Sequence, residues 1–235
     1  MIPWLTDDTP FPSVERALSS PNGLLAAGGD LTGPRLLEAY RSGIFPWFNP
    51  GDPILWWSPN PRMVLIPGEF KTSRSLAKVL RNTPYEVHTD TAFEQVMRSC
   101  AAPRAKNRAG HPGTWIDEDM IAAYCALHQL GYAHSVEIWM DGKLVGGLYG
   151  VSIGRMFYGE SMFSDVSNAS KIALAHLARQ LERWHFGMID CQMNTPHLAT
   201  LGAREIPRSE FIASLQELIH CAPKTDWQFD PDLFT

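Results

Sequence analysis

The residues best suited to chemistry are a carboxylate and a carboxamide that lie two positions apart. Asp190 and Gln192 follow a short apolar run in the segment GMIDCQM, which predicts a strand over 187–193. Side chains at positions i and i+2 of a strand share a face, so we expect both to point the same way. Together they would orient an attacking amine and accept its proton. The alternative is a strand end whose polar side chains meet solvent.

A second carboxylate, Glu160, stands in the segment YGESMF and interrupts an otherwise apolar strand. A carboxylate in that position must be paired or must face a cleft. Gly159 beside it allows another chain to approach the backbone closely. The alternative is an edge-strand glutamate in water.

Aromatic and basic segments suggest contacts with a nucleic acid. The Pro-rich stretch over 45–57 contains five rings, and a ring that stacks on a base contributes roughly 1–3 kcal/mol. These rings are Phe45, Trp47, Phe48, Trp56 and Trp57. Residues 71–108 carry eight Lys and Arg against three acidic residues, which suits phosphate contacts. The alternatives are a miniature aromatic core and a solvated helix face.

Composition excludes several classes of protein. The chain has 235 residues, 45% hydrophobic and 19% charged, which is globular rather than disordered. Its net charge of −5 excludes nucleic-acid binding by bulk charge alone. Four scattered cysteines and eight histidines have no metal-ligand spacing, and no nucleotide or serine-hydrolase motif occurs. The sequence predicts neither a signal peptide nor a membrane span, so we expect a cytoplasmic protein.

The elements that would position these residues change character near residue 68. We expect an irregular, turn-rich N-terminal domain over 1–68 and a second domain over 69–235. The expected helices span 32–43, 73–81, 91–100, 117–130, 168–184 and 207–220. The third would begin with a Thr91–Glu94 capping box, and Ser167 or Asn168 would cap the fifth. The expected strands cover 134–140, 143–151, 155–163 and 187–193, the first two joined by an Asp141–Gly142 turn.

The order hairpin, strand, helix, strand over 134–193 is typical of an acyltransferase core of the GNAT type, although many α+β folds share it. Eight segments then carry a closer resemblance. They are GLLAAGGDL, RSGIFPWFNPGDPILWWSPNPRMVL, GTWI, HSVEIW, LVGGLYGV, YGESMFS, NASKIAL and IDCQMNTPHLATLGAREIPR. Across roughly residues 11–211 the sequence resembles the leucyl/phenylalanyl-tRNA–protein transferases.

The resemblance implies an α+β fold with a small N-terminal domain and a GNAT-like C-terminal domain built on a mixed sheet. It implies that Leu or Phe, and less readily Met, moves from aminoacyl-tRNA to the N-terminal Arg or Lys of a protein or peptide. The product would carry an N-degron that marks it for proteolysis. The resemblance implies neither a metal nor an organic cofactor, because the tRNA ester is already activated. We expect a monomer.

The resemblance also assigns roles to individual residues. Gln192 would draw the amine proton through its amide oxygen, oriented by Asp190, and Glu160 would hold the cationic acceptor or the 3′ end in the same cleft. Residues that match the family's contacts to the terminal adenosine are Trp47, Trp115 and Tyr124. The donor side-chain pocket would consist of Leu148, Phe157, Leu174, Leu177 and Ile189. Some members carry a larger aromatic ring at 177, which leaves the relative preference for Leu and Phe open.

Separately from the resemblance, the basic segment suggests that Arg74, Lys78 and Arg81 meet the tRNA backbone. Two other functions compete with aminoacyl transfer. A CoA-dependent N-acetyltransferase needs a Gly-rich loop before the core helix, whereas this chain has SMFSDVSNASK, without glycine. A non-catalytic RNA-binding module would use the basic segment and the aromatic rings. It would leave Asp190, Gln192 and the apolar pocket without a purpose.

Overall fold

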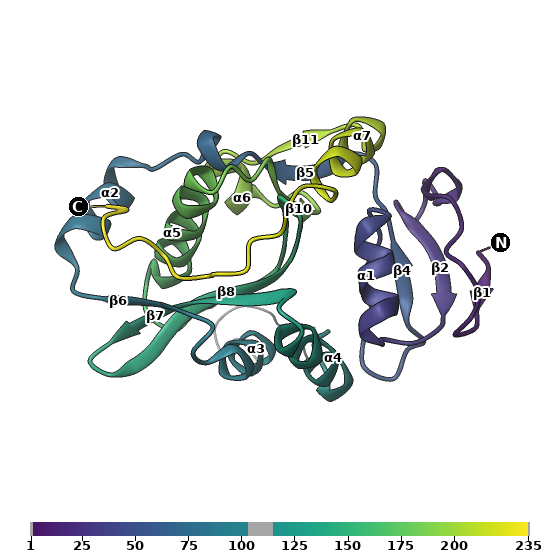
Figure 1. The fold of residues 1–235 in the computed structure, drawn as a ribbon, viewed down its shortest axis with the longest axis horizontal. Helices are drawn as coiled ribbons and strands as arrows, with labels where there is room; N and C mark the ends of the chain where they lie inside the picture. The colour runs from purple at the N-terminus through teal and green to yellow at the C-terminus, as the bar shows by residue number, and fades with distance from the viewer. Residues whose placement is uncertain (1, 103–114, 235) are drawn as a thin grey trace.

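The structure is a computed structural model that describes residues 2–102 and 115–234. The described chain forms a small N-terminal unit and a larger unit beside it (Figure 1). The small unit contains a four-stranded sheet in the order β1-β2-β4-β3 and one α-helix. Its elements are β1 (Trp4–Leu5), β2 (Leu24–Gly28), α1 (Gly33–Arg41), β3 (Phe45–Pro46) and β4 (Leu55–Trp57), with a 3-10 turn at Val14–Arg16.

This small sheet corrects the expectation of an irregular N-terminal domain. Its strands have two to five residues, too few for an alternating pattern to identify them. Buried aromatic rings fill its core, as the alternative interpretation of the aromatic stretch proposed. Trp56 is fully buried and donates from its indole nitrogen to the Gly28 carbonyl at 2.8 Å, whereas Trp47 is 38% exposed.

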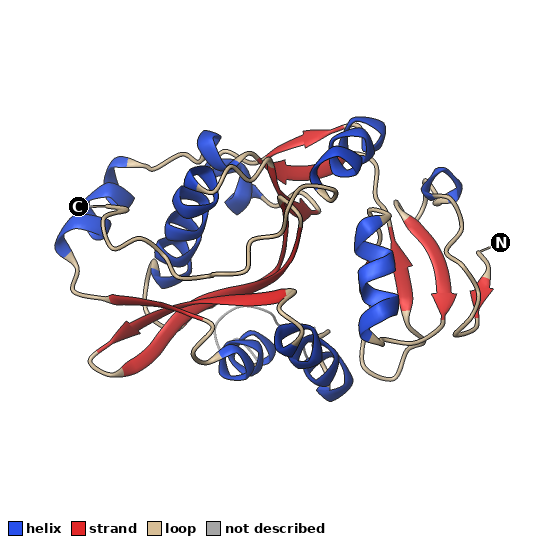
Figure 2. Cartoon of the chain, in the orientation of Figure 1, coloured by secondary structure: helices blue, strands red, loops and turns tan. Residues whose placement is uncertain are grey.

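The larger unit is built on a seven-stranded mixed sheet in the order β11-β5-β10-β9-β8-β7-β6 (Figure 2). Its strands are β5 (Arg62–Leu65), β6 (Glu86–Thr89), β7 (Ala133–Met140), β8 (Lys143–Ile153), β9 (Met156–Ser164), β10 (Met188–Gln192) and β11 (Arg204–Ile206). Strands β6 to β9 are antiparallel, and β10 runs parallel to β9. The predicted hairpin turn is present at Asp141–Gly142, where both residues have positive φ.

The crossover from β9 to β10 is made by helix α5 (Ala169–Arg183). The predicted order of hairpin, strand, helix and strand is therefore confirmed, and the fold is α+β with a mixed sheet. The remaining helices are α2 (Arg74–Asn82), α3 (Phe93–Ala101), α4 (Glu118–Gln129), α6 (Pro196–Thr200) and α7 (Arg208–Leu218), with a 3-10 turn at Pro67–Glu69. All six expected helices are present, and α6 is additional.

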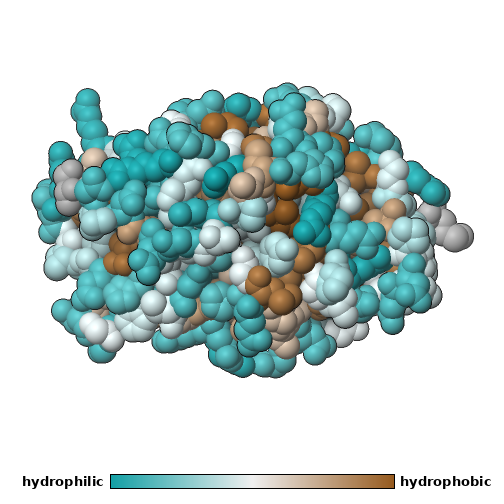
Figure 3. Space-filling view, viewed as in Figure 1, coloured by the Kyte–Doolittle hydropathy of each residue, from teal (hydrophilic) through white to brown (hydrophobic). Residues whose placement is uncertain are grey.

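Helices cover both faces of the large sheet. α2 and α5 pack on one face, and α3 and α4 pack on the other (Figure 1). The core beneath α3 and α4 continues into the small unit through α1, so the two units share buried apolar residues. On the surface, apolar residues gather near the middle of the view in Figure 3. Within the described residues, no helix is long and apolar enough to cross a membrane.

β5 pairs with β10 and β11, so the change from the small sheet to the large sheet falls between Trp57 and Arg62, a few residues before the expected domain boundary at residue 68. Two sequence expectations about helix starts need correction. The Thr91 capping box does not form, because Thr91 and the backbone N–H of Ala92 both donate to the buried Glu137 on β7. The N-cap of α5 is Asn168, as one alternative had it, but its side chain makes no capping bond.

Candidate active site

A pocket of about 520 Å³ lies where the small unit meets the large sheet. Its walls come from β3 and Trp47 of the small unit, from β8 to β10, from α5, and from the segment after β10. Nine of the predicted site residues line it. They are Trp47, Trp115, Leu148, Phe157, Glu160, Leu174, Leu177, Ile189 and Gln192. Asp190 and Tyr124 do not line this pocket.

The apolar part of the pocket is formed by the five residues predicted to receive the donor side chain. Leu148, Phe157 and Ile189 project from three adjacent strands. Leu174 and Leu177 face them from α5, where a spacing of three residues places them on one side of the helix. All five are buried. The surface they form is suited to a branched or aromatic side chain of moderate size.

Asp190 is not on the pocket surface, because a buried arginine holds it. Arg62 on β5 donates from Nε to Oδ1 at 2.8 Å and from Nη2 to Oδ2 at 2.6 Å. The third guanidinium nitrogen donates to the Gly43 carbonyl at 3.1 Å, and the rings of Phe45 and Phe211 flank the guanidinium. Both partners of this bidentate ion pair are at most 1% exposed. The negative charge of Asp190 is thus neutralised inside the protein.

Gln192 faces the pocket although Asp190 does not, which corrects the expectation that the two share a face. The β10–β5 register shifts between them, and Gln192 takes a positive φ of 55°. The alternation of side chains between the two faces of β10 is therefore interrupted at Gln192. Asp190 contacts Gln192 through the backbone, with Oδ1 accepting from the Gln192 N–H at 2.9 Å. The Gln192 Nε2 atom is buried and has no hydrogen-bond partner among the described residues.

Glu160 is the one predicted carboxylate that lines the pocket. The β8–β9 register shifts here, so Glu160 is the extra residue of a bulge. Tyr40 of α1 donates to one carboxylate oxygen at 2.7 Å, Tyr124 of α4 donates to the other at 3.1 Å, and the two hydroxyls contact each other. Burial raises the pKa of Glu160 to about 7, although these tyrosine hydrogen bonds lower it.

The three residues predicted to contact adenosine fall into two groups. Trp47 and Trp115 line the pocket, and Trp47 packs edge-on against Trp57 with ring centroids 5.5 Å apart. Tyr124 is fully buried behind Glu160, so its hydroxyl serves the carboxylate rather than the pocket surface. The contact of Tyr124 with adenosine stays a prediction, and in this structure the ring is buried.

The basic residues predicted to meet tRNA lie on helix α2. Arg74, Lys78 and Arg81 are exposed, and none forms an ion pair within the described part of the chain. Arg98, by contrast, is paired with Glu94 and Glu118. Arg104, Lys106 and Arg108, which also contribute to the basic segment, lie outside the described residues.

Sequence reasoning missed three polar residues of this site. Arg62 and Tyr40 come from distant parts of the chain, and only the fold brings them to Asp190 and Glu160. Tyr149 lines the pocket, and its buried hydroxyl has no hydrogen-bond partner among the described residues. Arg62 and Tyr149 stand in segments that carry the family resemblance, but no local feature of the sequence indicates the role of any of the three. In the described parts of the chain, no group of three His, Cys, Asp or Glu could hold a metal ion.

Comparison with known proteins identifies the family. A model described as leucyl/phenylalanyl-tRNA protein transferase matches residues 64–216, and the model for the N-terminal domain of that transferase matches residues 29–60. This chain belongs to the leucyl/phenylalanyl-tRNA–protein transferase family. The change of sheet between Trp57 and Arg62 falls at the break between the two matches.

Relatives with that name cover nearly the whole chain. The one from Nitrosospira multiformis is 65% identical over 98% of this chain and 98% of its own. The one from Nitrosomonas europaea is 62% identical over 98% of this chain and 96% of its own. Among solved structures, a GCN5-related N-acetyltransferase from Kribbella flavida aligns with a TM-score of 0.36 and 10% identity. That alignment covers 72% of this chain and 59% of the other and is too remote to indicate function.

Proposed function

We propose that this protein moves a leucyl or phenylalanyl group, and less readily a methionyl group, from aminoacyl-tRNA to the N-terminal Arg or Lys of an acceptor protein. The observation that carries the proposal is the family match over nearly the full length of the chain. The apolar pocket at the unit boundary supports it, because a donor side chain needs such a site. The product would carry an N-degron and would be degraded by proteolysis.

In this proposal the donor is held at two places. Its side chain enters the apolar pocket over Phe157, and Leu177 limits the space there. The terminal adenosine stacks on Trp47 or Trp115, which stand on the same pocket. Arg74 and its neighbours on α2 hold the tRNA backbone. We place the reaction in the cytoplasm and expect a monomer.

Gln192 takes part in the chemistry through its side-chain amide. The acceptor amine attacks the ester carbonyl, a C–N bond forms, and the C–O bond to the ribose breaks. The Gln192 amide oxygen accepts a hydrogen bond from the amine, while Nε2, which has no hydrogen-bond partner among the described residues, donates to the carbonyl oxygen as negative charge develops. An amide is a poor base, so the proton finally reaches the ribose oxygen.

Asp190 acts indirectly in this scheme. Its carboxylate fixes the Gln192 backbone and is itself fixed by Arg62. The sequence-based proposal that Asp190 polarises the Gln192 side chain or attracts the acceptor does not fit this geometry. Glu160 is the carboxylate left to attract the cationic acceptor at the pocket. No metal, ATP or CoA enters the scheme, because the ester supplies the driving force.

A CoA-dependent N-acetyltransferase is the rival on the same core. Between β9 and α5 the chain reads DVSN over 165–168, without the glycines that would cradle a pyrophosphate. The experiment that separates the two is incubation with labelled Leu-tRNA and peptides beginning with Arg, Lys or Ala, beside a parallel incubation with labelled acetyl-CoA. Label should reach the Arg and Lys peptides from Leu-tRNA alone. Labelling from acetyl-CoA, without labelling from Leu-tRNA, would contradict the proposal.

A further inference from the structure

The C-terminal strap, which we define as residues 221–234, follows α7 and contains no helix or strand. It passes alongside α5 on the way to the C-terminus (Figure 1). Two ties fasten it to α5. The Asp230 backbone N–H donates to Gln180 at 2.8 Å, and Arg183 is paired with Asp230 and Asp232. The strap lies beyond residue 216, where the family match ends.

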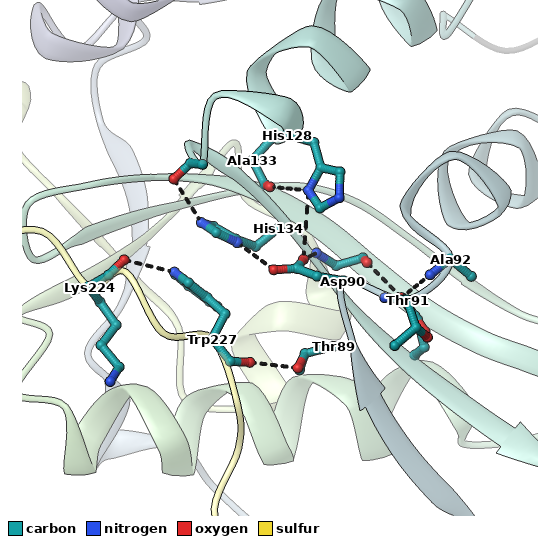
Figure 4. Close-up of polar contacts among 12 residues, drawn as sticks. Thr89, Asp90, Thr91, Ala92, His128, Ala133, His134, Lys224 and Trp227 are labelled. Carbon is teal, nitrogen blue, oxygen red and sulfur yellow. Dashed lines mark hydrogen bonds and ion pairs between the residues drawn. The ribbon is translucent and has the colours of Figure 1, made fainter.

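Trp227 is the buried residue of the strap that reaches the sheet. Its side chain is 5% exposed and stacks on the His134 ring, with centroids 3.8 Å apart and planes 12° apart. The Trp227 carbonyl accepts from Thr89, and its indole N–H donates to the Lys224 carbonyl (Figure 4). The imidazole is fixed in turn, because its two nitrogens lie within hydrogen-bonding distance of the Asp90 carboxylate and the Gly131 carbonyl. The indole therefore has one defined position.

Phe157 connects this position to the donor pocket. His134 pairs across the sheet with Gly150 of β8, and a Cβ on Gly150 would lie 2.6 Å from two carbons of the Phe157 ring. The ring therefore lies directly over Gly150, close to the His134–Trp227 stack. Its centroid is 5.8 Å from that of Trp227. Phe157 lines the pocket, whereas Trp227 does not.

We propose that Trp227 is a specificity-determining residue that sets the relative use of leucyl and phenylalanyl donors by holding the Phe157 ring against the pocket. The inference rests on the proposed function. Protein interiors are close-packed, so a ring backed on one side by an indole cannot move away from a bound side chain. A smaller residue at 227 leaves space behind Phe157. The ring can then withdraw, and the pocket gains room that a phenylalanyl group fills better than a leucyl group.

The test compares purified wild type with Trp227→Leu, using Phe-tRNA and Leu-tRNA with one Arg-initiated peptide. The ratio of kcat/KM for Phe-tRNA to kcat/KM for Leu-tRNA should rise by about three- to tenfold in Trp227→Leu. This is less than the roughly 10- to 200-fold that one methylene in direct contact with a substrate is worth, because Trp227 acts through Phe157. General loss of stability would lower both values together and leave the ratio unchanged. If Trp227→Leu does not fold, Trp227→Phe should shift the ratio in the same direction by a smaller factor.

Two controls isolate the contact. Phe229→Leu removes a strap ring that packs on Trp184 but makes no ring contact with Phe157, so the ratio should stay at the wild-type value. In a Phe157→Leu background, Trp227→Leu should no longer shift the ratio, because the ring it supports is gone. An unchanged ratio in a folded Trp227 variant, or an equal shift in Phe229→Leu, would overturn the inference. Absence of transfer by the wild type would instead reject the proposed function.

Discussion

Arg62 binds both carboxylate oxygens of Asp190 in an ion pair that solvent barely reaches. The two residues lie 128 positions apart, at neighbouring points of strands β5 and β10. Through the Asp190 carboxylate, the pair also fixes the backbone of Gln192 in a left-handed conformation that a non-glycine residue rarely adopts. The pair thus connects the stability of the sheet to the position of the proposed reacting amide.

Asp190→Asn should therefore reduce both stability and turnover. The substitution leaves the Arg62 guanidinium buried without its counter-charge, which costs about 3 kcal/mol in the free energy of unfolding. Turnover in transfer from Leu-tRNA should fall by roughly 10- to 1000-fold as Gln192 loses its support. Arg62→Met should act similarly, and the double variant should lose less than the sum of the two. Urea unfolding and single-turnover rates measure these effects, and wild-type values for both in Asp190→Asn would contradict this role.

Glu160 should make stability depend on pH. Burial raises its pKa from 4.5 to about 7, so the folded protein binds this proton more tightly than the unfolded chain does. The contribution is complete below about pH 4.5 and is lost as the pH rises through about 7, by about 3 kcal/mol in total. Glu160→Gln removes this pH-dependent contribution to the free energy of unfolding. The difference in unfolding free energy between wild type and this variant, measured from pH 5 to pH 8, should show that decline, and a constant difference would exclude it.

Glu160 should also account for the choice of acceptor. Because Asp190 is neutralised by Arg62, Glu160 is the predicted carboxylate that lines the pocket, and at pH 8, above its pKa of about 7, it is ionised and can attract a cationic N-terminal side chain. Glu160→Gln should reduce the preference for Arg- over Ala-initiated peptides by about tenfold, the effect of losing one charge-assisted contact. Competition between the two peptides measures the preference. A preference that persists at its wild-type value would place acceptor selection elsewhere.

The α2 surface should control the salt dependence of tRNA binding. Replacing Arg74 and Lys78 by Ala should weaken tRNA binding and reduce the slope of log K against log salt by about one unit for each lost phosphate contact. Transfer from a minimal aminoacyl-adenosine should remain close to wild type. The matched control replaces Arg16 and Lys143 by Ala. These are two exposed basic residues outside α2, so the slope should stay at its wild-type value. An unchanged slope in the α2 variant would show that this face of the helix contacts solvent and not the tRNA phosphates.

The sequence predicts the parts of the fold whose patterns are long and local. Helix α5 and strands β7 to β9 have many residues at one period, and the hairpin turn carries Asp141–Gly142. The strands of the small sheet and strand β5 have five residues or fewer. No period can be read from so few residues, so their pairing follows from tertiary contacts. The sequence therefore does not reveal that β5 pairs into the large sheet.

The candidate site likewise has one part that the sequence predicts and another that only the fold reveals. The family resemblance predicts the apolar pocket and Gln192, and Leu148, Leu174, Ile189 and Gln192 stand in the quoted matching segments. It could not reveal that Tyr40 and Tyr124 enclose Glu160, since these contacts join residues 120 and 36 positions away in the chain. Nor could it reveal the bulge at Gln192, because the side chains of a strand over residues 190–192 are expected to alternate between its two faces. Arg62 had no local feature that distinguished it from other arginines.

The most direct test of the central claim is single-turnover transfer from Leu-tRNA to an Arg-initiated peptide by Gln192→Ala. Gln192 lines the pocket, and its buried Nε2 has no hydrogen-bond partner among the described residues, so loss of the side-chain amide should leave melting temperature and donor affinity unchanged. The rate of transfer should fall by roughly 10- to 1000-fold. A rate near that of wild type, in a folded variant that binds Leu-tRNA normally, would contradict the participation of Gln192 in the reaction.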